Sequence, residues 1–137
     1  MTQKSVSAFM LQDTSVLEET KEIKFPQFSE AFVIRSLTAD EFDNITKRST
    51  RRTKQNGAMV KEVDQNKLVD TLVSEAVVTP DLNDAGLQEH YGTIGNAAGT
   101  ARKMLKAGQW GDLIKEVQDL SGFDQEPLDE LVDEVKN

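Results

Sequence analysis

The chain has 137 residues, a single histidine and no cysteine, and its 24 acidic and 16 basic side chains give a net charge of −8. The absence of cysteine excludes a disulfide scaffold, a thiol nucleophile and a cysteine-based zinc site, and the acidic balance argues against a general nucleic-acid binder. The length suits one domain. Because no 18-residue apolar run or signal-peptide layout is present, we expect a soluble, cytoplasmic protein with no membrane partner.

The first third of the chain predicts a small β element. Residues 1–20 suggest a loosely ordered N-terminal segment with one helical turn that docks on the remainder. Residues 21–25 alternate charged and apolar side chains, and residues 31–36 follow with a β-branched and aromatic run. These two strands predict a short hairpin or a small sheet, which must lie on helices because an isolated hairpin is marginally stable.

Two helices are predicted in the middle of the chain. Thr38 and Glu41 have the spacing of a capping box, which predicts a helix beginning immediately after Thr38. After an expected loop over residues 53–62, Asp64 starts a second helix. Its apolar face continues to Val77, and the following Thr79-Pro80 stops it.

The last third predicts four further helices. Residues 83–91 and 94–105 are expected to form short helices, with Gly108 as the C-cap of the second. A helix over residues 110–120 ends near Gly122, and residues 125–136 form an acidic amphipathic helix. The predicted fold class is therefore mostly α, an α+β type, with one core domain over residues 21–122 and an acidic C-terminal helix within residues 123–137.

The charge is distributed unevenly. Residues 112–137 contain nine acidic residues against two lysines, a net charge of −7. A basic cluster falls within eight residues: Lys47, Arg48, Arg51, Arg52 and Lys54. Two interpretations stay open for this cluster: it binds phosphates or an acidic partner, or it is the solvated end of a helix.

No catalytic, cofactor or metal site is predicted. His90 has no histidine partner for a triad or a two-histidine metal motif, so a hydrolase built around it is disfavoured. Residues 81–92 begin like a calcium loop, but Ala85 and Gly92 occupy positions that need oxygen ligands. The sequence instead offers an apolar candidate surface. We predict that this surface binds a partner or mediates self-association. Its six residues are Trp110, Leu113, Leu128, Leu131, Val132 and Val135.

The chain resembles the XkdN-like tail assembly chaperones of phages and prophages. The resemblance depends on short motifs in matching order over most of the chain. In the N-terminal half they are residues 34–38 (IRSLT) and 49–52 (STRR), and in the C-terminal half they are 80–82 (PDL), 87–92 (LQEHYG), 104–108 (MLKAG), 117–118 (VQ) and 121–124 (SGFD). Gly86, Gly99 and Thr100 depart from the pattern where better helix formers are expected, and Ala107 stands where the family tends to have proline.

The resemblance implies a non-enzymatic function in the bacterial cytoplasm. A family member binds the long helical tape-measure protein, keeps it soluble and helps the tail-tube protein assemble around it, and it is absent from the finished virion. The alternative is a small nucleic-acid-binding or regulatory protein that uses the basic cluster at 47–54, with Lys47, Arg48, Arg51 and Arg52 on a helix. The acidic composition argues against nucleic acid as the partner.

Overall fold

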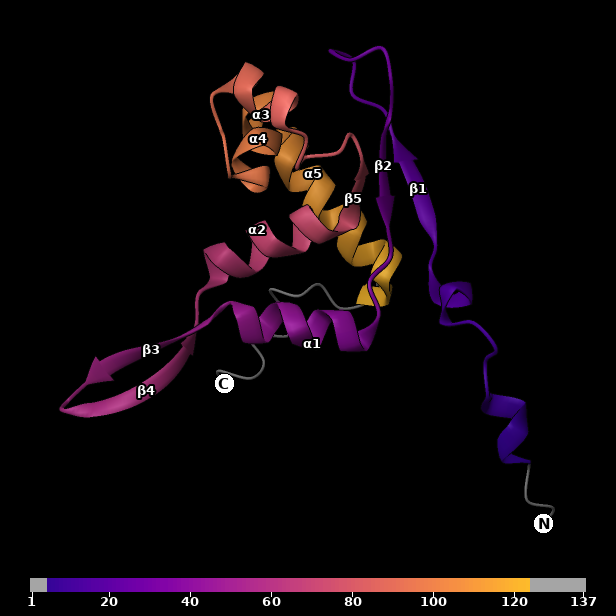
Figure 1. The fold of residues 1–137 in the computed structure, drawn as a ribbon, viewed down its shortest axis with the longest axis vertical. Helices are drawn as coiled ribbons and strands as arrows, with labels where there is room; N and C mark the ends of the chain where they lie inside the picture. Colours follow the sequence, from indigo (N-terminus) through magenta and orange to yellow (C-terminus); the bar gives the residue numbers. More distant parts are fainter. Residues whose placement is uncertain (1–4, 124–137) are drawn as a thin grey trace.

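The computed structural model describes residues 5–123, which form an α+β fold (Figure 1). The strands are β1 (Thr20–Ile23), β2 (Phe32–Arg35), β3 (Thr50–Gln55), β4 (Ala58–Val63) and β5 (Val77–Thr79). The helices are α1 (Ala39–Arg48), α2 (Gln65–Ala76), α3 (Ala85–Tyr91), α4 (Ala97–Met104) and α5 (Ala107–Gln118). Short 3₁₀ turns, η1 (Val6–Phe9) and η2 (Thr14–Leu17), precede the first strand, and one π-helical turn, η3 (Asp119–Phe123), extends α5.

The two predicted N-terminal strands are confirmed, and a third strand joins them. β1 pairs antiparallel with β2, with Thr20 opposite Arg35 and Ile23 opposite Phe32. β5 pairs antiparallel with the other edge of β2, which gives the order β1-β2-β5. The prediction that the second helix includes Val77 is wrong, because the helix ends at Ala76 and the β-branched run of residues 77–79 adopts the extended form that it favours.

The core lies between this sheet and the helices. The largest fully buried apolar side chains come from β2, α1, α2, α5 and the turn before α3: Ile34, Ile45, Val73, Leu82, Leu113 and Val117. Phe25 and Phe32 pack edge to face with their ring centroids 5.2 Å apart. The sheet therefore lies on helices, as the marginal stability of a lone hairpin requires.

Helix α1 begins where the sequence predicts. The Glu41 N–H donates to the Thr38 hydroxyl at 3.2 Å, and the Thr38 N–H donates to the Glu41 carboxylate at 3.0 Å. Asp64 likewise accepts from the Lys67 N–H at 3.2 Å and caps α2. Both starts satisfy backbone donors that have no partner within their own helix.

The loop predicted over residues 53–62 is wrong. Strands β3 and β4 form a hairpin there, with Thr50 opposite Val63 and Gln55 opposite Ala58. Asn56 and Gly57 form its two-residue turn with φ of 52° and 82°, and Asn-Gly is the pair that favours such a turn. The hairpin projects from the rest of the structure and lies beyond the end of α1 (Figure 1).

The helix boundaries near residue 108 also differ from the prediction. Gly108 is not a C-cap, because it lies in the first turn of α5, which begins at Ala107. The Gln109 side chain accepts from the Lys106 N–H at 2.9 Å and fixes this earlier start. Gly122 has a φ of 98°, so the predicted helix end at this residue is confirmed. The predicted helix over 125–136 lies outside the described residues.

Candidate partner-binding surfaces

An exposed apolar N-terminal arm is the most prominent surface feature. The arm, defined here as residues 5–17, contains the two 3₁₀ turns, and none of the residues in these turns is buried. Its large apolar side chains are between 52% and 74% exposed: Val6, Phe9, Met10, Leu11, Val16 and Leu17. Clusters of exposed apolar side chains mark interaction surfaces. The sequence-based expectation of one turn docked on the core is therefore wrong for this segment, which has two turns and extends away from the helices (Figure 1).

Local polar side chains form the turns of the arm. The Ser5 hydroxyl accepts from the Ser7 N–H at the start of η1, and the Asp13 carboxylate accepts from the Ser15 N–H at 2.9 Å at the start of η2. Two hydrogen bonds from Ser15 lower the pKa of Asp13. The bond from the Ser15 backbone N–H has the larger effect, and the bond from the Ser15 hydroxyl has the smaller one. Val6 and Phe9 are three residues apart in a 3₁₀ turn, which places both on the same side of it.

The base of the arm is held beside the end of β2 by Ser36, which follows this strand and is buried. The Ser36 hydroxyl accepts from the Glu19 N–H at 2.8 Å and donates to the Leu17 carbonyl at 3.2 Å. The Ser36 N–H donates to the Glu19 carbonyl at 2.7 Å. These three bonds fix where the arm leaves the sheet, so the apolar residues before Leu17 are presented from a defined point.

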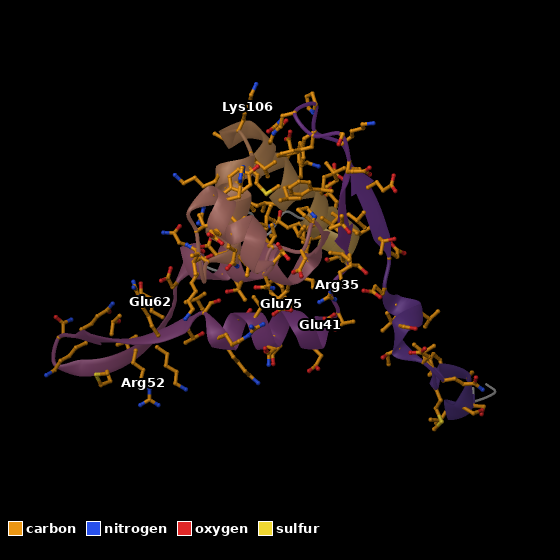
Figure 2. The ribbon with its side chains drawn as sticks, turned by 45° about the horizontal axis from the view of Figure 1, so that its top comes forward. Arg35, Glu41, Arg52, Glu62, Glu75 and Lys106 are labelled. Atoms are coloured by element: carbon orange, nitrogen blue, oxygen red, sulfur yellow. The ribbon has the colours of Figure 1, made fainter. Side chains whose placement is uncertain are left out.

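An ion cluster around Arg35 joins the base of the arm to α1 and α2 (Figure 2). The Arg35 guanidinium lies 2.8 Å from Glu41, 3.8 Å from Glu75 and 3.9 Å from Glu18, and its Nε donates to the Glu75 carbonyl at 3.1 Å. Arg48 also pairs with Glu75 at 3.0 Å. The cluster connects β2, α1 and α2 with Glu18 beside the arm, which indicates a structural role.

The pKa of Glu41 reflects this environment. Partial burial of the carboxyl raises its pKa, but the hydrogen bond from the Thr38 backbone and the bond and charge of Arg35 together outweigh this effect. The net pKa of Glu41 is lower than the ordinary value of 4.5. Glu41 is therefore held as a charged carboxylate and is unsuited to proton transfer near neutral pH.

A small apolar pocket lies where the described chain ends. Its volume is about 220 Å³, and its apolar lining comes from α1, α2, the end of α5 and the residues beside them: Leu37, Phe42, Leu72, Val117 and Phe123. Phe42 and Phe123 pack with ring centroids 5.4 Å apart, and the Ser121 hydroxyl accepts from the Leu37 N–H at 2.9 Å. The described part of the chain therefore ends beside the N-terminal half of α1.

The basic cluster is divided between two elements. Lys47 and Arg48 end α1, whereas Arg51, Arg52 and Lys54 lie on β3. Lys47 pairs with Asp43 at 3.0 Å, Arg48 with Glu75 at 3.0 Å, and Arg51 with Asp64 at 3.7 Å. The alternative prediction places these cations on one helix. That placement is wrong, because α1 ends at Arg48, and Arg51 and Arg52 lie on β3.

Two of the six predicted partner-binding residues are within the described part of the chain. Leu113 is fully buried in the core, so it contributes to folding and does not form a surface. Trp110 is half-buried, and Arg102, which pairs with Asp70, lies over its ring at 4.9 Å from the centroid. Leu128, Leu131, Val132 and Val135 lie outside the described residues, and their role stays a prediction.

Residues 5–123 contain no group of three or more histidine, cysteine or acidic side chains placed to hold a metal ion. His90 is exposed and packs edge to face on Tyr91, with the ring centroids 4.8 Å apart. None of the described helices is long and apolar enough to cross a membrane.

The comparisons with known proteins agree with the resemblance seen in the sequence. A crystal structure of the protein YqbN has the same fold, with a TM-score of 0.72 and 20% sequence identity over 89% of this chain and 99% of that one. No curated protein sequence matches the chain. The family model described as "Phage XkdN-like tail assembly chaperone protein, TAC" matches residues 6–136, which include the N-terminal arm from Val6 onward. The chain therefore belongs to the XkdN-like family of phage tail assembly chaperones.

Proposed function

We propose that this protein binds the tape-measure protein during tail assembly and that the N-terminal arm is a principal contact surface for this client. The observation that carries the proposal is the exposure of six large apolar side chains within residues 6–17. A tape-measure protein, as the family resemblance implies, is a long helix with an apolar stripe that must stay soluble before the tube forms around it. Apolar side chains on a charged body suit such a client.

The arm is built for this role in two respects. Its base is fixed beside the end of β2 by the bonds of Ser36 with Leu17 and Glu19, so its position relative to the body is defined. Its apolar side chains lie outside the core, so they can bind a client without unfolding the protein. The predicted stripe Leu128, Leu131, Val132 and Val135 adds a second apolar surface, with Trp110 as a further contact. Promotion of tail-tube assembly and self-association are parts of the same proposal.

The test is co-expression of a tape-measure fragment with the chaperone in bacteria, followed by measurement of the soluble fraction of the fragment. Substituting Phe9→Ser together with Met10→Ser removes two apolar side chains that are 74% and 68% exposed. The matched control is Val78→Ser with Ile94→Ser, at positions 48% and 78% exposed elsewhere on the surface. We expect the arm variant to lose most of the solubilisation and the control to retain it. Equal solubilisation by both variants would contradict the proposal.

A further inference from the structure

The β3–β4 hairpin has one strongly basic face. Successive side chains of a strand point to opposite sides, so Arg52 and Lys54 share a side of β3. The register places Lys61 of β4 opposite Arg52, and Met59 opposite Lys54. We define Arg52, Lys54 and Lys61 as the basic face. Arg51 and Glu62 are paired on the other side, and Figure 2 shows Arg52 and Glu62 on opposite sides of the ribbon.

The charges of this face are unbalanced within the described structure. Arg52 and Lys61 are directly opposed like charges, which destabilise a strand pair. Across residues 5–123, no carboxylate lies within 4.0 Å of a basic-face nitrogen, whereas Arg51 has Asp64 at 3.7 Å. The hairpin packs mainly on itself, and a two-stranded hairpin is marginally stable alone. An anionic partner would relieve this repulsion and support the hairpin.

The chain contains an acidic segment of matching charge. Residues 124–137 have six acidic residues and one lysine, a net charge of −5. In the helix that the sequence predicts over residues 125–136, Glu130 and Glu134 are one turn apart, about 6 Å, which is close to the roughly 7 Å between the side chains of Arg52 and Lys54. Its acidic side chains then lie opposite the stripe of Leu128, Leu131, Val132 and Val135.

The segment starts within reach of the hairpin of its own chain. It follows Phe123, which packs on Phe42 in the first half of α1. From Phe42 the chain path to Arg52 is about 20 Å along the rest of α1 and the start of β3. A 12-residue helix spans about 18 Å, and 14 extended residues reach about 46 Å. A short tether of this kind gives an effective concentration on the order of millimolar, which favours the same chain over a second copy.

We propose that the basic face of the β3–β4 hairpin binds residues 124–137 of the same chain through their acidic side. The contact leaves the apolar stripe of the segment directed away from the hairpin, where it is accessible to another protein. This contact is separate from client binding and does not depend on it, because the contact forms within the chaperone before any client is bound. Nucleic acid, the other anionic class of partner, fits an acidic chain less well.

Carbodiimide cross-linking of the full chain tests this contact, because the reagent joins a lysine amine to a carboxylate only when the two are in contact. The experiment uses an equal mixture of ¹⁴N and ¹⁵N protein and identifies the linked peptides by mass spectrometry. We expect Lys54 and Lys61 to be linked to carboxylates within residues 124–137, in peptide pairs with a single isotope. Mixed-isotope pairs in the proportion that random pairing between copies gives in an equal mixture would overturn the proposal in favour of a second copy.

The decisive variant reverses the charge of Arg52, a residue of the basic face that the reagent does not link. Arg52→Glu keeps both reactive lysines, and we expect it to reduce the yield of their links at least about threefold, because it replaces an attraction with a repulsion. Lys106→Glu is the matched control at the opposite end of the structure (Figure 2), and we expect it to leave the yield unchanged. An equal yield in Arg52→Glu, or a shift of duplex DNA by the wild-type protein at about 150 mM salt, would overturn the proposal.

Discussion

Ser36 and Glu19 exchange two hydrogen bonds at the point where the N-terminal arm joins the sheet. The Glu19 N–H donates to the Ser36 hydroxyl at 2.8 Å, and the Ser36 N–H donates to the Glu19 carbonyl at 2.7 Å. The same hydroxyl also donates to the carbonyl of Leu17. One buried side chain thus determines how the apolar arm leaves the folded body.

Ser36→Ala should loosen the base of the arm. The substitution removes a hydroxyl that bonds the Glu19 N–H and the Leu17 carbonyl. Both partners belong to exposed residues that water can reach, so the expected cost is about 0.5–1.5 kcal/mol in the free energy of unfolding. Urea denaturation measures that cost, and limited proteolysis should show faster cleavage within residues 5–17. Ser29→Ala, at an exposed serine, is the control and should change neither quantity. A wild-type cleavage rate in Ser36→Ala would show that the hydroxyl does not position the arm.

Leu113→Ala should destabilise the fold. Leu113 is fully buried, so truncation leaves a cavity and costs about 2–5 kcal/mol. Leu11→Ala truncates a leucine that is 52% exposed, and its effect on the free energy of unfolding should be within about 0.5 kcal/mol. Thermal or urea unfolding distinguishes the two variants. A mild effect of Leu113→Ala would contradict its assignment to the core.

Glu41 should contribute stability that depends on pH. Its pKa is depressed in the folded state, so its contribution is fully present above the ordinary value of 4.5 and is lost as the pH falls through the lower, folded-state pKa. Glu41→Gln keeps an acceptor for the Thr38 N–H and removes the charge beside Arg35. The difference in unfolding free energy between wild type and Glu41→Gln should be constant from pH 8 to about 6 and should shrink below about 4.5. A difference independent of pH would contradict the charge pairing.

Gly57→Ala should weaken the hairpin without weakening the core. Gly57 has a φ of +82°, where an alanine side chain costs about 1–2 kcal/mol. Since β3 and β4 pack mainly on each other, amide exchange should accelerate within residues 50–63 while the melting temperature changes little. Gly111→Ala is the contrast, because Gly111 lies inside α5 with open space around it and should gain stability. Global destabilisation by Gly57→Ala would show that the hairpin is coupled to the core.

Removal of the C-terminal stripe tests the second predicted apolar surface. We expect deletion of residues 125–137 to lower tape-measure solubilisation in co-expression, because it removes Leu128, Leu131, Val132 and Val135. The fold should persist, since the side chains of the described core come from residues 23–120. Unchanged solubilisation would exclude this stripe as a client surface.

The sequence predicted the elements whose signals are local. Thr38 and Glu41 predicted the start of α1, and the alternation in residues 21–25 predicted a strand. The β3–β4 hairpin was missed because polar and charged side chains occupy both of its faces, so the apolar alternation of a half-buried strand is absent. The Asn56-Gly57 pair was the available signal for its turn.

The candidate surfaces were harder to predict because a sequence does not show which apolar residues find a partner within the fold. Leu113 and Phe9 are both large and apolar, but one is fully buried and the other is 74% exposed. The five cations read as one cluster, whereas the end of α1 after Arg48 divides them between a helix and a strand. Tertiary packing decides both outcomes.

Amide hydrogen exchange of the arm with and without a tape-measure fragment tests the central claim most directly. In the free protein, residues 5–17 should exchange rapidly because their side chains pack on little. With saturating fragment, the account predicts exchange slowed about tenfold or more across residues 6–17. Unchanged exchange of the arm in a complex that is otherwise fully formed would contradict the claim that the arm binds the client.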